Sequence, residues 1–252
     1  MTVTTADLGA ARVITWDRQA RRNAWDLGTM TAIADAMEAA GADPAVRCIV
    51  LRGAGEHFSA GDDLYAAVEA DSEAWAATIE GFQRLTRVAM AAPVPAIAAI
   101  DGVCVGGALE FAASCDLRLC TDRVRLMTPE VGIGLVATGA GTLLLPELVG
   151  EGAARELLLG GEPRDAAWAH EHGFTTEVVA PGELDGRIEH WAEVFARNSR
   201  IAVAATKAML NERLGVLLAT AMERETGHCV RLFGEEDARS ALRAFAERRA
   251  AP

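Results

Sequence analysis

The amino-acid sequence predicts an α/β protein, in which a core of buried strands alternating with helices is followed by a region made of helices alone. Three observations support this fold class. Short apolar and β-branched runs recur as far as residue 180, segments with helical periodicity lie between them, and from about Ile188 onward only helical patterns remain. We therefore expect an α/β core over residues 1–195 and a helical region over residues 196–252.

Five segments have the composition of strands buried in a sheet. Each is short, and many of its residues are apolar or β-branched, which is typical of a strand that is covered on both faces. In chain order these segments are 11–16 (ARVITW), 46–51 (VRCIVL), 95–100 (PAIAAI), 117–120 (LRLC) and 175–180 (TTEVVA).

Helical patterns lie between and after these strands. Residues 25–43 and 72–90 have helical periodicity, and a third helix is predicted to begin near Gly106 after a glycine-rich turn. Two further helical patterns cover residues 202–225 and 235–250. No low-complexity linker and no internal repeat interrupts this order.

The charge pattern argues against nucleic acid and membranes as partners. The formal net charge is -12, and lysine and arginine are scattered without a basic block. The first ten residues do not resemble a signal peptide. The uncharged run 88–100 contains two prolines and is shorter than the roughly 18 apolar residues of a membrane span. We expect a cytoplasmic protein.

The cysteines and histidines give no indication of a metal site. The five cysteines lie mostly in apolar stretches and form no C-x-x-C pair, so we expect buried thiols in a reducing compartment. His170 and His172 lie two residues apart on a predicted helix, where side chains diverge. We interpret them as surface residues.

Two glycine-rich turns each connect a predicted strand to a helix. Gly106 and Gly107 follow segment 95–100, and Gly61 follows segment 46–51. The first N–H groups of a helix lack partners within the helix, so they suit an anion or a polarised carbonyl oxygen. Two such donors stabilise an enolate by about 3 to 4 kcal/mol each. Taken alone, each turn is weak evidence, because most turns of this kind only connect a strand to a helix.

Glu110 is the one carboxylate within the apolar segment 102–115, GVCVGGALEFAASC. Charged side chains are rarely buried without a partner, and burial raises the pKa of a carboxyl group towards neutrality. A carboxyl group with such a pKa can give and take protons at neutral pH. The alternative is structural: Glu110 caps its own helix or pairs with an arginine such as Arg118.

Glu130 follows a short predicted strand in RLMTPEVGIG. The segment also has the features of an ordinary helix start, with Thr128 as N-cap, Pro129 at the first position and an acid in the first turn. A structural role is therefore as well supported as a catalytic one for Glu130 alone. Together with Glu110 it forms a pair of carboxylates in apolar surroundings, which is typical of general acid and base catalysis.

These segments resemble the enoyl-CoA hydratase/isomerase, or crotonase, superfamily over nearly the whole chain. Residues 12–64 end in FSAGDDL, which is similar to the family's F-x-A-G-x-D-L motif, and residues 93–134 are similar to its central motif. TKAMLNE (206–212) and AFAERR (244–249) match weaker signatures. The resemblance implies a spiral of ββα units with a C-terminal helical region that packs trimers or dimers of trimers.

The resemblance also implies an activity, the syn hydration of a trans-2-enoyl-CoA in fatty acid metabolism. The family's two oxyanion N–H groups correspond to Asp62 and Gly107, and its two water-flanking glutamates correspond to Glu110 and Glu130. By this likeness Glu110 deprotonates the water and Glu130 supplies the α proton. Many members with other chemistries lack one glutamate of the pair.

The same resemblance implies where an acyl-CoA thioester binds. Coenzyme A is part of the substrate, and no metal or redox cofactor is required. The substrate-binding residues implied are Ala24, Ala60, Gly61, Asp62, Asp63, Leu64, Gly106 and Gly107.

Three departures from the family pattern concern the acyl pocket and the subunit contacts. Segment 137–146, ATGAGTLLLP, lacks the usual Gln-Arg pair, and Ser240-Ala241 replace Glu-Gly. Asp62 adds a second carboxylate beside Asp63, where many members carry a small residue. The alternatives left open are an enoyl-CoA isomerase, a hydrolase, a specialised acyl-CoA dehydratase and a non-catalytic acyl-CoA-binding subunit.

Overall fold

The computed structural model of the protein describes residues 2–250, with side chains to residue 247. Its strands are β1 (Thr2–Leu8), β2 (Ala11–Asp17), β3 (Cys48–Gly53), β4 (Ala96–Ile100), β5 (Val103–Val105), β6 (Leu117–Thr121), β7 (Arg125–Met127) and β8 (Glu177–Val179). Six of them form one sheet in the order β1-β2-β3-β4-β6-β8, in which only β1 and β2 pair antiparallel. The short strands β5 and β7 form a second, parallel sheet.

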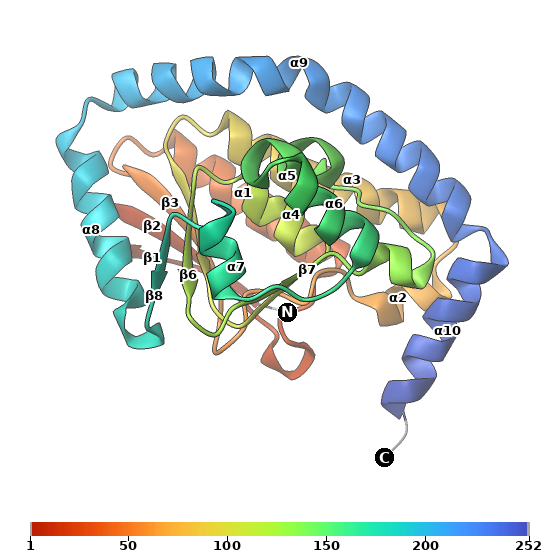
Figure 1. Cartoon of the computed structure of the whole chain (residues 1–252). Helices are drawn as coiled ribbons and strands as arrows, with labels where there is room; N and C mark the ends of the chain where they lie inside the picture. The colour runs from red at the N-terminus through yellow and green to blue at the C-terminus, as the bar shows by residue number, and fades with distance from the viewer. Residues whose placement is uncertain (1, 251–252) are drawn as a thin grey trace.

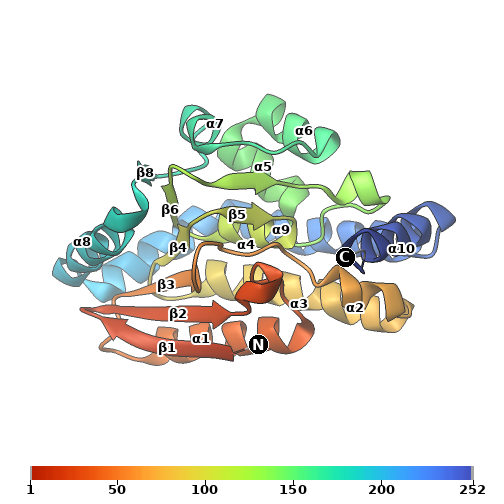
Figure 2. The same ribbon diagram turned by 90° about the horizontal axis from the view of Figure 1, so that it is seen from below.

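Helices cover both faces of the larger sheet (Figures 1 and 2). They are α1 (Leu27–Ala42), α2 (Leu64–Glu69), α3 (Ser72–Ala91), α4 (Gly107–Ser114), α5 (Gly141–Val149), α6 (Glu151–Gly160), α7 (Ala166–Glu171), α8 (Leu184–Arg197), α9 (Arg200–Phe233) and α10 (Glu236–Ala250). Three short 3-10 turns, η1 (Gln19–Arg21), η2 (Glu130–Ile133) and η3 (Pro181–Glu183), complete the elements.

The strands are apolar on both faces because each face is covered. Leu51 of β3 belongs to the large core cluster with Ile33 of α1, whereas its neighbour Val50 belongs to the cluster with Ile188 of α8. Successive side chains of a strand point to opposite faces, so one continuous apolar run serves both clusters. Burying a Leu, Ile or Val side chain contributes about 1.5 to 3 kcal/mol.

The α/β prediction is confirmed, as are all five predicted strands and the helices expected at 25–43, at 72–90 and near Gly106. Strands β1, β5 and β7 were not expected. β1 carries mostly exposed, polar residues at the edge of the sheet, and β5 and β7 have three residues each. Such strands have no recognisable apolar run, because pairing with a neighbour rather than burial determines them.

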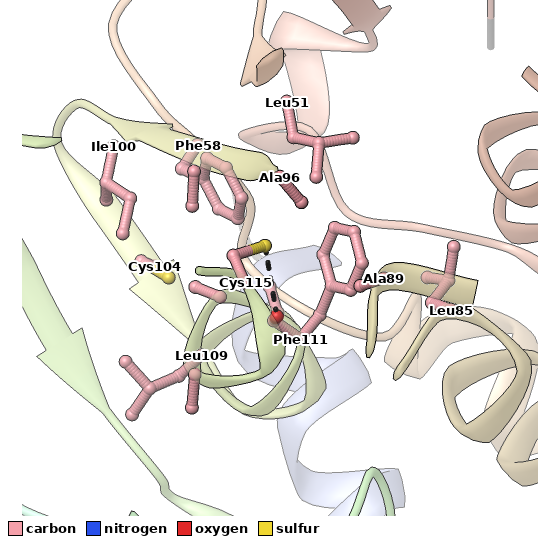
Figure 3. Packing of buried hydrophobic residues seen from close by; sticks show 14 of the residues in the cluster. Leu51, Phe58, Leu85, Ala89, Ala96, Ile100, Cys104, Leu109, Phe111 and Cys115 are labelled. Atoms are coloured by element: carbon pink, nitrogen blue, oxygen red, sulfur yellow. Dashed lines mark hydrogen bonds between the residues drawn. The ribbon is translucent and has the colours of Figure 1, made fainter. Parts of the chain in front are cut away.

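Helix α4 is fixed by the side chains on either side of Glu110. Figure 3 shows Phe111 of α4 beside Leu85 and Ala89 of α3, with Leu109 on another side of the helix. Both Leu109 and Phe111 are completely buried. Since side chains of a packed core occupy single rotamers, these neighbours determine where the intervening Glu110 points.

The two C-terminal helices extend along the core rather than forming a separate bundle. Helix α9 arches over α3 and α5, and α10 lies against α2 (Figure 1). The predicted boundary between residues 195 and 196 lies near the end of α8, and the division into two regions stays a prediction. None of the helices in the described part of the chain is long and apolar enough to cross a bilayer.

Lys207 attaches α9 to the core. Its ammonium group is buried and donates hydrogen bonds to the carbonyl oxygen of Ala89 at 2.7 Å, to that of Val94 at 3.3 Å and to Asp116 Oδ2 at 2.7 Å. Lys207→Met is therefore expected to lower the free energy of unfolding by about 3 kcal/mol, because these acceptors lose their common donor. Urea denaturation measures this change, and a loss below about 1 kcal/mol contradicts it.

Candidate active site

Two adjoining cavities lie between the two glycine-rich turns. The inner cavity has a volume of about 70 Å³, and the outer cavity has a volume of about 460 Å³. The residues that line both are Ala60, Asp62, Leu64, Val105, Pro129 and Ile133. A ligand that extends from one cavity into the other therefore lies next to Asp62.

The first turn presents the backbone of Asp62 to both cavities. The Trp25 N–H donates to Gly61 O at 2.7 Å, and the Asp63 N–H donates to Trp25 O at 2.8 Å. Gly61 has φ +80°, and a Cβ there would lie 2.5 Å from Val105 O. Among the hydrogen bonds of the described residues, the Asp62 N–H has no acceptor.

The second turn exposes the N–H of Gly107, the first residue of α4. Gly106 has φ +60°, and its N–H donates a hydrogen bond to Met127 O at 2.8 Å. This bond holds the backbone in place where α4 begins. A Cβ on Gly107 would lie 2.4 Å from the ring of Phe82, so only glycine fits here. Within the described chain the Gly107 N–H also lacks an acceptor. Each of the two turns thus supplies one N–H donor without a partner beside the cavities.

Glu110 is completely buried, and its carboxylate binds a turn opposite α4. Oε2 accepts hydrogen bonds from the N–H groups of Gly139 at 2.6 Å, Gly141 at 3.0 Å and Thr138 at 3.1 Å. Oε1 has a single contact within the described residues, at 3.4 Å from the Thr138 N–H. One oxygen is therefore held in place, and the other retains capacity to accept a proton.

The structural alternatives for Glu110 are wrong. Its carboxylate accepts from the turn at residues 138–141 rather than from its own helix. Arg118 donates instead to the carbonyl oxygens of Phe174, Ala112 and Cys115. The reason is geometric, because Arg118 follows the C-terminal end of α4, where carbonyl groups lack helical partners.

Glu130 begins η2 and lines the inner cavity. Its carboxyl group lies against the second turn, since a Cβ on Gly106 would be 2.8 Å from Glu130 Oε1. Burial raises the pKa of Glu130 to about 7. The expected helix start is wrong in detail, because the Thr128 hydroxyl donates to Leu157 O and Pro129 itself is the N-cap.

Glu225 of α9 is buried and adds a third glutamate to Glu110 and Glu130, which was not expected from the sequence. Its Oε2 accepts from the Ala140 N–H at 2.7 Å, and its Oε1 accepts from the N–H of Thr142 at 2.9 Å and from the Thr142 hydroxyl. Ala140 has φ +71°, a left-handed conformation, and starts α5. Alternate N–H groups of one turn therefore point to Glu110 and to Glu225.

The three carboxyl groups influence one another. Burial raises the pKa of Glu110 well above its ordinary value, and the charges of Glu225 and Glu130 raise it further. The N–H bonds from Gly139 and Gly141 act in the opposite direction. Burial also raises the pKa of Glu225, against the bonds from Thr142. The cluster therefore retains protons near neutral pH.

The Glu225 contacts predict a stability effect. Glu225→Ala is expected to lower the free energy of unfolding by about 1 to 3 kcal/mol, because two buried N–H groups and a hydroxyl lose their acceptor. Chemical denaturation measures the change. As a control, Glu223→Ala removes an exposed carboxylate from the same helix. Equal effects of the two substitutions contradict the prediction.

Most of the expected binding residues line a cavity. Those at the outer cavity are Ala24, Ala60, Asp62, Asp63 and Leu64, and those at the inner cavity include Gly106 and Gly107. Gly61 lines neither and lies beneath Val105 O. The lining of the outer cavity that was not expected includes the polar residues Arg21, Arg22, Tyr65 and Arg125. Their separation along the chain hides this cluster in the sequence.

The protein resembles known enzymes over nearly its full length. A protein with the name crotonyl-CoA hydratase from Syntrophomonas wolfei is 33% identical, with 93% of this chain and 91% of the relative covered. A short-chain-enoyl-CoA hydratase from Clostridium acetobutylicum is 31% identical, with 96% and 93% covered. The crystal structure of an enoyl-CoA hydratase/isomerase from Xanthobacter autotrophicus superposes with a TM-score of 0.87 at 32% identity, covering 98% of this chain and 97% of that chain.

The family model described as enoyl-CoA hydratase/isomerase matches residues 9–252. This match includes both glycine-rich turns and the three glutamates Glu110, Glu130 and Glu225. Together with the fold shared with solved members, it confirms the crotonase-like architecture. The chain belongs to the enoyl-CoA hydratase/isomerase family.

Proposed function

We propose that the protein is an enoyl-CoA hydratase, a lyase that adds water to the 2,3 double bond of a trans-2-enoyl-CoA in fatty acid metabolism. One observation carries this proposal: Glu130 and the two residues with unpartnered N–H donors, Asp62 and Gly107, line one cavity, and Glu110 lies in the first turn of α4 behind Gly107, where the charge of Glu130 acts on its carboxyl group. The relatives named as crotonyl-CoA and short-chain-enoyl-CoA hydratases support it.

Glu110 acts as the base in this scheme. The N–H groups on its Oε2 favour the carboxylate form against the effect of burial, and in the proposed scheme Glu110 starts as the carboxylate and Glu130 as the acid. A water molecule transfers a proton to Glu110 Oε1 as its oxygen bonds to C3 of the acyl group. The electron pair of the double bond moves onto the thioester oxygen, where the Asp62 and Gly107 N–H groups stabilise the enolate.

Glu130 completes the addition as the acid. It transfers its proton to C2, and the enolate returns to the thioester carbonyl. The proton that Glu110 gained passes back to Glu130 through solvent, which restores the starting state. Both glutamates act from one side of the acyl group, so hydrogen and hydroxyl add to the same face.

The outer cavity suits the coenzyme A part of the substrate. The guanidinium groups of Arg21, Arg22 and Arg125 supply positive charge for its phosphates. The backbone around Ala24 and at residues 60–64 follows the arm that leads to the thioester. This chemistry needs neither a metal nor a redox cofactor, because the thioester activates C3 and the protein supplies the proton transfers.

Loss of enoyl-thioester absorbance over a panel of trans-2-enoyl-CoA chain lengths tests the proposal. We expect turnover of at least one short member, starting with crotonyl-CoA. Conversion of 3-enoyl-CoA to 2-enoyl-CoA without hydration would instead identify an isomerase. Binding of thioesters without turnover of any of them would identify a non-catalytic subunit, and either result contradicts hydration.

The pH dependence follows from the acid role of Glu130. Its pKa is raised to about 7 by burial, so its proton is held below that pH and lost above it. We therefore expect kcat/KM for crotonyl-CoA to fall as the pH rises above about 7. Initial rates between pH 5 and 9 measure this profile, and a rate that stays constant from pH 6 to 9 contradicts it.

We further propose that α9 packs copies of the chain into trimers or dimers of trimers. Apolar side chains on this helix are highly exposed, including Ile201 at 83%, Leu210 at 74% and Val216 at 76%. Large apolar side chains gathered on one element are typical of an interaction surface. Light scattering coupled to size-exclusion chromatography tests this assembly, and a monomer at micromolar concentration contradicts it.

A further inference from the structure

Asp62 and Asp63 are neighbours in the chain, but their carboxyl groups have different surroundings. Asp63 Oδ2 lies 2.6 Å from a guanidinium nitrogen of Arg18. Asp62 lines both cavities, and its Oδ2 is shielded from solvent without a hydrogen-bond partner in the described part of the chain. The protein thus pairs the Asp63 carboxyl group with a cation and leaves Oδ2 of Asp62 without a partner, at a residue that lines both cavities.

The charges near Asp62 make this group able to donate as well as accept. Burial, together with the charges of Asp63 and Asp26, raises the pKa of Asp62 to about 7, although a hydrogen bond from the Asp63 N–H acts in the opposite direction. Near neutral pH the group is present both as acid and as carboxylate. A hydroxyl group, which accepts and donates, is a suitable partner for both forms.

The inner cavity is short and has rigid walls. Its volume of about 70 Å³ is much smaller than the 460 Å³ of the outer cavity. Trp75 forms part of one wall, and its ring stacks on that of Phe233 with the centroids 4.7 Å apart. Phe82 forms another part, and its ring centroid lies 5.9 Å from that of Trp25. Such aromatic walls resist displacement, so the cavity accepts only a short acyl group.

Polar side chains also line this short cavity. Besides Glu130, they are Asp62, Thr78 and Thr138. The Thr78 hydroxyl donates to Ala74 O, which leaves its oxygen able to accept. A plain alkyl tail offers no hydrogen bond to Asp62 Oδ2, and a buried oxygen that stays without a partner is unfavourable.

We propose that Asp62 determines specificity by hydrogen bonding to a hydroxyl group on a short enoyl thioester. This inference rests on the proposed hydratase function. The Asp62 N–H meets the thioester oxygen in that scheme, so its side chain is within reach of the first few carbons of the acyl group. The preferred substrate class is a four- or five-carbon 2-enoyl thioester with a hydroxyl near C4.

A matched pair of substrates tests the proposal. We expect wild-type kcat/KM for 4-hydroxycrotonyl-CoA to exceed that for crotonyl-CoA by at least about tenfold, since a site built for a substrate hydroxyl discriminates against the analogue that lacks it. Asp62→Ala keeps the backbone N–H and is expected to bring the two values within about threefold of each other. Asp62→Asn keeps the size and one acceptor and is expected to retain part of the preference.

The control is Glu69→Gln, which removes an exposed negative charge from the adjacent helix α2. It is expected to keep the wild-type ratio. Equal wild-type rates for the two substrates, or an equal change of both rates in Asp62→Ala, overturn the inference and indicate a contact with the pantetheine arm or the thioester. The hydratase function survives that outcome, whereas loss of turnover with both substrates in the wild type contradicts the function itself.

Discussion

Glu110→Gln is expected to lower kcat for crotonyl-CoA hydration by at least about a hundredfold, with a much smaller effect on KM. Glutamine has the same size, and its amide oxygen accepts the N–H bonds from Gly139 and Gly141. The substitution therefore keeps the shape of the site and removes the base. Steady-state kinetics on the purified variant measure the change.

The matched control for this substitution is Glu189→Gln, which makes the same chemical change at an exposed position on α8. It is expected to retain wild-type kinetics. Circular dichroism and thermal melting establish that both variants are folded. A Glu110→Gln enzyme with more than a tenth of the wild-type kcat would exclude Glu110 as the base.

Glu130→Gln is expected to lower kcat to a similar extent, and in addition to abolish proton exchange at C2. With butyryl-CoA in D₂O there is no water addition, so exchange reports only on removal and return of the α proton. Glu130 lines the inner cavity next to Gly106 and Gly107, where that proton lies in the proposed scheme. Proton NMR follows the loss of the C2 signal.

The two glutamate variants separate the roles of the two carboxyl groups. Glu110→Gln is expected to retain exchange at C2, because Glu130 and both N–H donors remain. If exchange is lost in Glu110→Gln and kept in Glu130→Gln, the acid and base are interchanged. Exchange in both variants would show that another group, such as Asp62, handles the α proton.

The burial of Glu110 was predictable from the sequence, but its partners were not. A single charge among Leu109, Phe111 and small residues indicates a desolvated carboxylate, and the structure confirms it. The partner N–H groups at residues 138–141 come from a segment far along the chain. Backbone N–H groups are present at nearly every residue, so no sequence pattern identifies the ones that converge.

Glu225 shows a second limit of prediction from sequence. It lies in AMERE, where charges at helical spacing are typical of a solvated face. It is buried because α9 lies over the turn at the start of α5, a contact between segments about 80 residues apart. The five strands with apolar runs, the helices at 25–43 and 72–90 and the two glycine-rich turns depend on local composition, and those were predicted correctly.

The stereochemistry of hydration in D₂O tests the central claim most directly, because it requires base, acid and oxyanion donors to act on one face of the acyl group. The 3-hydroxybutyryl-CoA formed from crotonyl-CoA is purified, and the relative configuration at C2 and C3 is read from proton NMR couplings. The proposed arrangement predicts one deuterium at C2, on the same face as the C3 hydroxyl. An anti product, a mixture of both configurations at C2, or the absence of hydration would contradict it.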